Sequence, residues 1–177
     1  FANIKVLTYS YNIAKYDLIK ETGVQGDKTV IEYLNKVLTF ELTSINQFFL
    51  HARMYKNWGL ESLNSKSYKK SIKDMKQSDD LIERVLFLEG LPNLQQLHRL
   101  RIGEHTEEML NCDMAFQMEQ LPLLREAIAH CEKVGDYVSR ELLEAILAYE
   151  EEHVDWIEAQ QYLISHAGLE NYLQSQM

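Results

Sequence analysis

Hydrophobic and polar residues along most of this chain recur with the period of amphipathic helices. From about residue 28 onward, apolar residues stand three and four positions apart, so that each segment presents one apolar face. Asp27 stands where an N-cap residue is expected, and glycine or proline residues separate the periodic segments. The pattern predicts four long helices and a short fifth one, over residues 29–58, 61–89, 104–133, 137–166 and 169–176.

The connection between the second and third predicted helices is long. Residues 93–103 carry no helical period, and a connection of this length can cross the whole length of a bundle. The third helix is therefore expected to run parallel to the second, with a kink at Pro122. Four long helices, a long crossover and a short fifth C-terminal helix predict an all-α, ferritin-like four-helix bundle over residues 27–177.

Residues 1–26 lack this periodicity. They have neither an uninterrupted apolar region nor a small-residue cleavage site, so they do not match the pattern of a signal peptide. Gly23 and Gly26 separate them from the first predicted helix. We expect a disordered or loosely attached tail that is not part of the bundle.

Composition and charge narrow the choice of partners. Of the 177 residues, 46% are hydrophobic, and the formal net charge is −9. This charge disfavours nucleic acid and anionic membranes as partners and suits a protein that attracts cations. No apolar run is long enough to span a membrane. Cys112 and Cys131 do not have the spacing of zinc ligands, and we expect two free thiols in the reducing cytoplasm, a disulfide being the weaker alternative.

Glu150 and His153 are the clearest candidates for chemistry. They lie three positions apart, on the helix face that Leu143 and Ile146 share, so a carboxylate and an imidazole are expected to point into the core. A buried carboxylate is costly unless it is paired or binds a metal. Glu41 lies in the apolar stripe of the first helix and is expected to meet this pair.

A dinuclear iron centre in such a bundle uses one Glu from each of two helices and a Glu-x-x-His pair from each of the other two. Asp74 is one methylene shorter than Glu, and Gln77 and Gln117 offer only neutral oxygens, so we expect weak, single-metal occupancy. Two alternatives stay open: Glu150 and His153 satisfy each other or solvent, and Asp74 and Gln77 lie on a solvated face. The side chains available for the centre are Glu41, Asp74, Gln77, Gln117, Glu150 and His153.

Longer segments carry a resemblance to a known family. Over residues 26–177 the chain resembles the bacterioferritins, which implies iron as cargo and a hollow shell of twenty-four subunits that stores ferric mineral. The matching segments are residues 45–54, 57–60, 86–94, 124–128, 136–140 and 171–173.

The resemblance implies that the ferroxidase ligands fall on the six centre positions named above. Family members with a working centre have Glu, Glu, His, Glu, Glu and His there, so this chain departs at Asp74, Gln77 and Gln117. Phe48 replaces a tyrosine near the centre, and Lys69 and Lys73 replace residues that bind iron on the inner surface. The remaining histidines have no ligand spacing and are expected at the surface or in satisfied interface positions: His51, His98, His105, His130 and His166.

The resemblance also implies a haem b site. Met75 matches the axial methionine of the family, one from each of two subunits across a two-fold interface. It follows Asp74 directly, so it is expected to point away from the metal centre. The residues that would line the haem pocket are Leu42, Ile45, Asn46, Phe49, Trp58 and Tyr68.

Three functions follow from these expectations. The first is an iron-storage subunit that binds haem and co-assembles with a second, ferroxidase-competent bacterioferritin subunit, with a ferredoxin-type protein as reductant. The alternative is an active ferroxidase that oxidises Fe²⁺ with oxygen at a dinuclear centre that has lost some of its ligands, so enzymatic activity stays open. A DNA-protecting mini-ferritin is disfavoured by the −9 charge and the predicted fifth helix.

The tail has a further interpretation under this resemblance. Val24 stands where the initiator methionine of the family would be, and a valine codon can serve as a start codon in bacteria. We therefore expect residues 1–23 to come from upstream in-frame sequence and not to be part of the natural protein.

Overall fold

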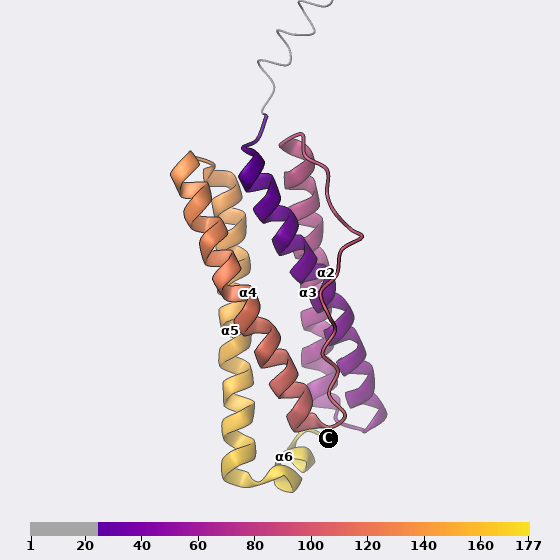
Figure 1. Ribbon diagram of the computed structural model, residues 1–177. Helices are drawn as coiled ribbons and strands as arrows, with labels where there is room; N and C mark the ends of the chain where they lie inside the picture. Colours follow the sequence, from indigo (N-terminus) through magenta and orange to yellow (C-terminus); the bar gives the residue numbers. More distant parts are fainter. Residues whose placement is uncertain (1–24) are drawn as a thin grey trace, which may run out of the picture.

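The chain folds into a helical bundle, shown in Figure 1 by a computed structural model that describes residues 25–177. The predicted four long helices and short fifth helix are confirmed, with ends close to the predicted positions. The expected tail and the interpretation of residues 1–23 fall on residues that lie outside the described part, except for residues 25 and 26. The helices are α2 (Lys28–Asn57), α3 (Glu61–Phe87), α4 (Thr106–Val134), α5 (Tyr137–Ala167) and α6 (Leu169–Ser175).

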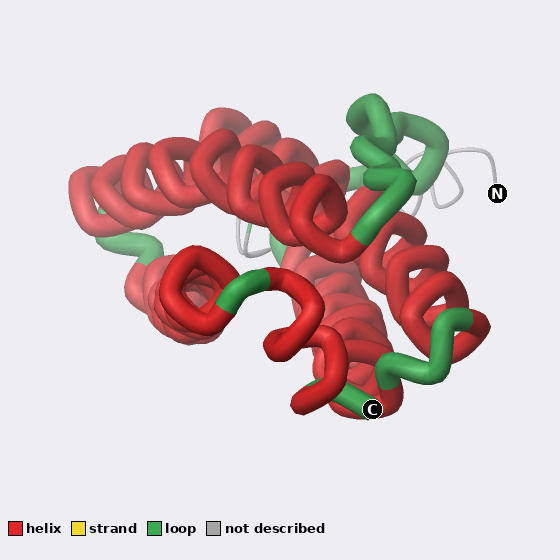
Figure 2. Tube along the Cα trace, turned by 90° about the horizontal axis from the view of Figure 1, so that it is seen from below, coloured by secondary structure: helices red, strands yellow, loops and turns green. Residues whose placement is uncertain are grey.

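Two antiparallel helix pairs make up the bundle. Helix α2 packs mainly against α3, and α4 packs mainly against α5. The connection from residue 88 to residue 105 runs along the bundle, so that α4 points in the same direction as α3, as predicted (Figure 1). The view along the bundle in Figure 2 shows the short helix α6 lying across the end where α5 stops.

Polar side chains of α2 hold the long crossover in place. Three backbone N–H groups of the crossover donate to side-chain oxygens spaced along this helix, which satisfies groups that a helix or strand would otherwise pair. These bonds run from Asn93 to Asn35 (2.7 Å), from His98 to Thr43 (2.9 Å) and from Arg101 to Gln47 (3.0 Å).

The helix ends follow from local sequence. The Asp27 carboxylate caps α2 by accepting a hydrogen bond from the backbone of Val30 (3.0 Å). Gly135 ends α4 in the left-handed conformation, with φ of 76°, which a residue with a Cβ rarely adopts. Asp136 then caps α5 through the backbone N–H of Ser139 (3.0 Å). Pro122 lies inside α4, which continues through it to Val134.

Two apolar clusters flank a buried polar layer. The upper cluster surrounds Leu34, Leu38 and Leu81, and the lower one surrounds Tyr55 and Met109. Each fully buried side chain of this size contributes roughly 1.5–3 kcal/mol relative to exposure. Between the two clusters, all four long helices place polar side chains in the interior: Glu41, Gln47, Lys70, Asp74, Gln117 and Glu150 are among them.

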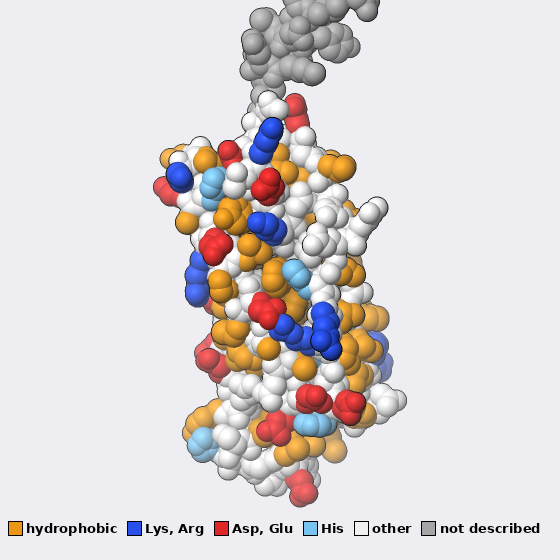
Figure 3. All heavy atoms as spheres, in the orientation of Figure 1, with side chains coloured by type: hydrophobic (Ala, Val, Ile, Leu, Met, Phe, Trp, Pro, Cys, Tyr) orange, Lys and Arg blue, Asp and Glu red, His pale blue; other side chains and the backbone are white. Residues whose placement is uncertain are grey.

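One face of the molecule is mixed in charge. On the face shown in Figure 3, acidic, basic and hydrophobic side chains alternate, without one continuous field of either sign. Among residues 25–177, none of the helices is both long and apolar enough to cross a membrane.

Candidate metal centre

The polar layer brings three carboxylates together. Glu41 on α2, Asp74 on α3 and Glu150 on α5 each place a carboxylate oxygen within 4.8 Å of those of the other two. All three side chains are fully buried. The solvated face considered for Asp74 and Gln77 is therefore wrong, because their helix face turns toward α2 and α5 and leaves them 0% and 3% exposed.

Lys70 enters this group from α3, one turn before Asp74. Its Nζ atom donates to Oδ1 of Asp74 at 2.6 Å and to Oε1 of Glu150 at 2.9 Å. The same nitrogen lies 2.9 Å from Oε2 of Glu150. Only 1% of the lysine side chain is exposed, so solvent does not screen these contacts. An ammonium ion therefore lies among the carboxylates that were expected to hold metal.

Neutral donors complete the contacts of the carboxylates. Ser44 on α2 donates to Oδ2 of Asp74 at 2.5 Å, and the amide of Gln120 on α4 donates to Oε1 of Glu41 at 2.6 Å. The second oxygen of Glu41 has no hydrogen-bond partner among the described residues. All four long helices thus take part in the centre.

Burial and the Lys70 ammonium group shift the pKa values of the clustered carboxyl groups in opposite directions. Burial raises the pKa of Glu150 to about 7, although Lys70 opposes the rise. Burial, with Asp74 and Glu150 nearby, raises the pKa of Glu41 well above its usual range. For Lys70, burial would lower the pKa, but the charges of Asp74, Glu150 and Glu41 outweigh it and hold the pKa above its ordinary value. The cluster therefore keeps its cation and carries little net negative charge.

His153 lies beside the cluster in an aromatic setting. The ring of Phe48 meets its imidazole edge-on at 5.0 Å, and Trp156 stacks on it at 5.6 Å. Burial, with the charges of Lys70 and Lys66, lowers the pKa of His153 well below its usual range, so the ring is neutral. Its Nε2 atom has no hydrogen-bond partner within the described residues. Glu150 is held by Lys70, and both Glu150 and His153 are buried, so the alternative in which the two satisfy each other or solvent is wrong.

The two glutamines that replace family ligands are also buried in this layer. Gln77 is 3% exposed and Gln117 is 0% exposed. Neither Oε1 of Gln77 nor either amide atom of Gln117 has a hydrogen-bond partner in residues 25–177. Buried polar atoms without partners are rare and mark a place where a ligand, water or ion fits.

The sequence patterns missed one buried residue and left the position of another open. Lys70 was not considered, although it shares a helix face with Asp74 and Gln77 through its spacing of four and seven positions. His51 was expected at the surface or in a satisfied interface position, and the second holds: it is 0% exposed, and its Nδ1 lies 3.0 Å from Oδ1 of Asp113. This face of α2 packs against α4, where Asp113 supplies the partner.

Met75 lies on the other side of α3 and is 51% exposed. Tyr68 lies seven positions before Met75 on the same helix, and Phe49 lies on α2; their rings are 39% and 47% exposed, with centroids 6.3 Å apart. The guanidinium of Arg53 lies over both rings, at 5.5 and 4.9 Å. The expectation that Met75 points away from the carboxylates is therefore confirmed.

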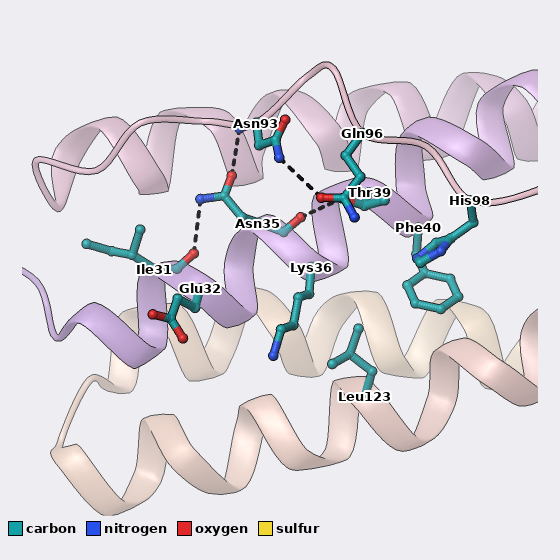
Figure 4. Close-up of a pocket in the computed structure, with 10 residues that line it drawn as sticks. All are labelled: Ile31, Glu32, Asn35, Lys36, Thr39, Phe40, Asn93, Gln96, His98 and Leu123. Carbon is teal, nitrogen blue, oxygen red and sulfur yellow. Dashed lines mark hydrogen bonds between the residues drawn. The ribbon is translucent and has the colours of Figure 1, made fainter.

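A surface groove of about 610 Å³ lies apart from this centre, between α2, the crossover and α4. Figure 4 shows the backbone N–H of Asn93 donating to the side-chain oxygen of Asn35 along one wall. The rings of Phe40 and His98 lie beside each other, with centroids 4.2 Å apart. The carboxylates of the metal centre do not line it. The groove therefore has no part in the chemistry considered for the centre.

Comparison with known proteins identifies relatives that match most of the chain. Residues 31–166 match the ferritin-like domain. The chain is 45% identical to a bacterioferritin of Rhodobacter capsulatus over 149 residues, which cover 84% of this chain and 92% of the relative. It is 44% identical to a bacterial ferritin of Synechocystis over 155 residues, or 87% of this chain and 99% of the relative. A bacterioferritin of Brucella melitensis is 40% identical over 149 residues, 84% of this chain and 92% of the relative.

Proposed function

The chain belongs to the bacterioferritins, ferritin-like proteins of iron storage, and we propose that it serves as their haem-binding subunit. In this role it forms part of the wall of a hollow shell and shares that shell with a second subunit that oxidises iron. The observation that carries the proposal is the exposed thioether of Met75, on the side of α3 opposite the carboxylates.

The surface around Met75 supports an interface with a second copy of the chain. Exposed apolar side chains are common singly, but a contiguous group marks a binding surface. Tyr68, Ile72 and Met75 recur at helical spacing on one face of α3, and the ring of Phe49 on α2 lies 6.3 Å from that of Tyr68. Since one chain supplies one methionine, a symmetric ligand pair requires the same face of a second chain, as a two-fold axis provides.

These residues fit haem b as the bound group. A thioether is a suitable axial ligand, and aromatic and aliphatic side chains suit a flat apolar ring. Bound haem supplies one-electron exchange, for which a ferredoxin-type protein is the reductant that we propose. With haem bound, Met75 would hold it, and Phe49 and Tyr68 would exclude water from its ring.

The centre supports storage without rapid oxidation by this subunit. Relative to the pattern that the family resemblance implies, the second helix lacks its imidazole at Gln77, and the third lacks its carboxylate at Gln117. Lys70 already occupies oxygens of Asp74 and Glu150. The alternative of an active ferroxidase is not favoured, because two iron ions need more anionic ligands than these positions provide.

Haem content tests the proposal. Met75→Leu is compared with Met118→Leu, because Met118 on α4 is 45% exposed and so is similarly accessible. After reconstitution with haem, the methionine-ligated spectrum is expected in the wild type and in the Met118 variant and to be lost in the Met75 variant. Light scattering on the same samples checks that all three assemble alike. An unchanged haem spectrum in Met75→Leu would refute the assignment.

A further inference from the structure

Lys70 holds a position that a metal ion would take. Its Nζ atom is within 2.9 Å of three carboxylate oxygens, two from Glu150 and one from Asp74. Glu150, Asp74 and Glu41 form the one group of three potential metal-binding side chains found within residues 25–177. An ammonium group has three N–H donors and no acceptor, so it binds the same oxygen lone pairs that a cation would use.

Unpartnered atoms around the ammonium indicate a site built for more than a lysine. Oε2 of Glu41 and Nε2 of His153 are buried without hydrogen-bond partners in the described chain. Both are of the types that coordinate divalent transition metals. Their side chains are 0% and 2% exposed, so bulk water does not satisfy them.

Charge makes the lysine and a metal ion mutually exclusive. Moving a divalent ion next to a buried ammonium brings like charges together in a region of low dielectric constant. Lys66 and Lys73 lie on the same helix and add to the positive potential at the layer. Because Lys70 is covalently part of α3, no concentration of metal displaces it without moving a buried side chain.

We infer that Lys70 is a permanent internal cation that closes this centre to divalent metal ions, and that loss of its charge opens a single-metal site. The ligands of that opened site are Asp74 and Glu150, with Glu41 in the same group, whereas His153 is not a member of it. This inference rests on the proposed function, since it explains at one residue why the subunit does not oxidise iron. It adds that replacing Lys70 by a neutral residue restores metal binding at this centre.

Cobalt binding to the assembled protein tests the inference. Co²⁺ is titrated into the wild type, Lys70→Met and Lys70→Arg, with bound metal counted by equilibrium dialysis and its coordination followed by visible absorption. Lys70→Met is expected to bind one more Co²⁺ per chain than the wild type, with affinity higher by at least about tenfold. Lys70→Arg keeps the charge and is expected to behave as the wild type does.

Further variants separate this site from others on the shell. In Lys70→Met with Glu150→Gln, the additional Co²⁺ is expected to be lost. If Lys70→Met fails to assemble, Lys70→Gln removes the same charge while keeping a donor among the carboxylates. The inference is overturned if neither neutral variant gains Co²⁺, or if the wild type binds Co²⁺ that Glu150→Gln removes.

The haem spectrum of the same preparations distinguishes the two proposals. Met75 lies outside the carboxylate group, so haem binding is expected to be equal in the wild type and all Lys70 variants. A wild type without haem would refute the proposed function while leaving the cobalt result to stand by itself. Haem binding with no gain of Co²⁺ would refute the inference alone.

Discussion

Lys70 on α3 and Glu150 on α5 form an ion pair across the bundle interior, with N–O distances of 2.9 Å and side chains that are 1% and 0% exposed. Asp74 shares the same ammonium at 2.6 Å. Helices α3 and α5, which have few other contacts with each other, are thus joined by a charged link. The link joins two helices of the bundle, as metal ions do in a dinuclear centre.

Removing the lysine is expected to destabilise the protein strongly. Lys70→Ala leaves two buried carboxylates without their cation, and breaking a buried pair from one side costs about 3–5 kcal/mol. Lys69→Ala is the matched control, since Lys69 is exposed one position earlier and its loss should change stability by less than about 0.5 kcal/mol. Urea unfolding followed by helical circular dichroism measures both. Equal losses in the two variants would contradict the role assigned to the buried pair.

Asp136 is expected to make stability depend on pH at the start of α5. Burial raises its pKa, but hydrogen bonds from Ser139 and the Arg84 guanidinium, whose nitrogen lies 2.6 Å away, hold the pKa below its ordinary value. A carboxyl with a lowered folded-state pKa stabilises fully above its unfolded value of about 3.9 and loses that effect as pH falls through the folded value.

Variants of Asp136 separate its effect as a helix cap from the effect of its charge. Asp136→Ala is expected to lose about 1–2 kcal/mol at pH 7, and the difference from the wild type should narrow below about pH 4. Asp136→Asn keeps a capping oxygen and should lose less. Exposed Asp80→Ala serves as the control. Thermal unfolding at several pH values gives the comparison, and a difference that stays constant down to pH 3 would argue against the charge.

Reinstating the family's ligands alone is expected to be insufficient for iron oxidation. A variant with Asp74→Glu, Gln77→His and Gln117→Glu still contains the Lys70 ammonium, so it should show no fast phase when Fe²⁺ and oxygen are mixed. Adding Lys70→Met should raise the initial rate by roughly 10–100-fold, the scale of effects at metal-site supporting residues. Stopped-flow absorbance measures the rate. A fast phase in the three-substitution variant would show that Lys70 yields to iron.

Gly103 is expected to be intolerant of any side chain. A Cβ atom there would lie 2.7 Å from Cα of Met109 and also overlap its backbone nitrogen, at the point where the crossover enters α4. Gly103→Ala should cost about 1–3 kcal/mol through overpacking. Two of the three overlaps are with the backbone of Met109 and one is with its Cγ atom, so Met109→Ala should relieve only a minor part of the cost. A double-mutant cycle from urea unfolding tests this, and rescue by Met109→Ala would contradict it.

Most of the fold could be predicted from periodicity, because the described chain folds by burying one face of each helix. The parallel course of α3 and α4 followed from the length of the crossover alone. The hydrogen bonds that hold the crossover could not be predicted, since Asn35, Thr43 and Gln47 are of types common on any solvated helix face. Their partners lie more than fifty positions away in the sequence.

The acidic residues of the candidate site could be predicted from the sequence, but the buried Lys70 could not. Glu41 and Glu150 stood out as carboxylates in apolar stripes, and Asp74 followed from the ligand pattern of a dinuclear centre in a four-helix bundle. Lys70 lies in a run with Lys69 and Lys73, where a solvated lysine is the ordinary expectation. Its spacing of four from Asp74 placed it on the inner face, but only the three-dimensional arrangement brings Glu150 within reach.

The internal ammonium has a consequence for when the subunit can be made. A protein whose core carboxylates need metal gains folding free energy from free metal, so its stability rises and falls with supply. In this chain the charge is balanced from within, and its folding should be uncoupled from the iron content of the cell. Such a chain is expected to fold equally well when iron is scarce and when it is abundant.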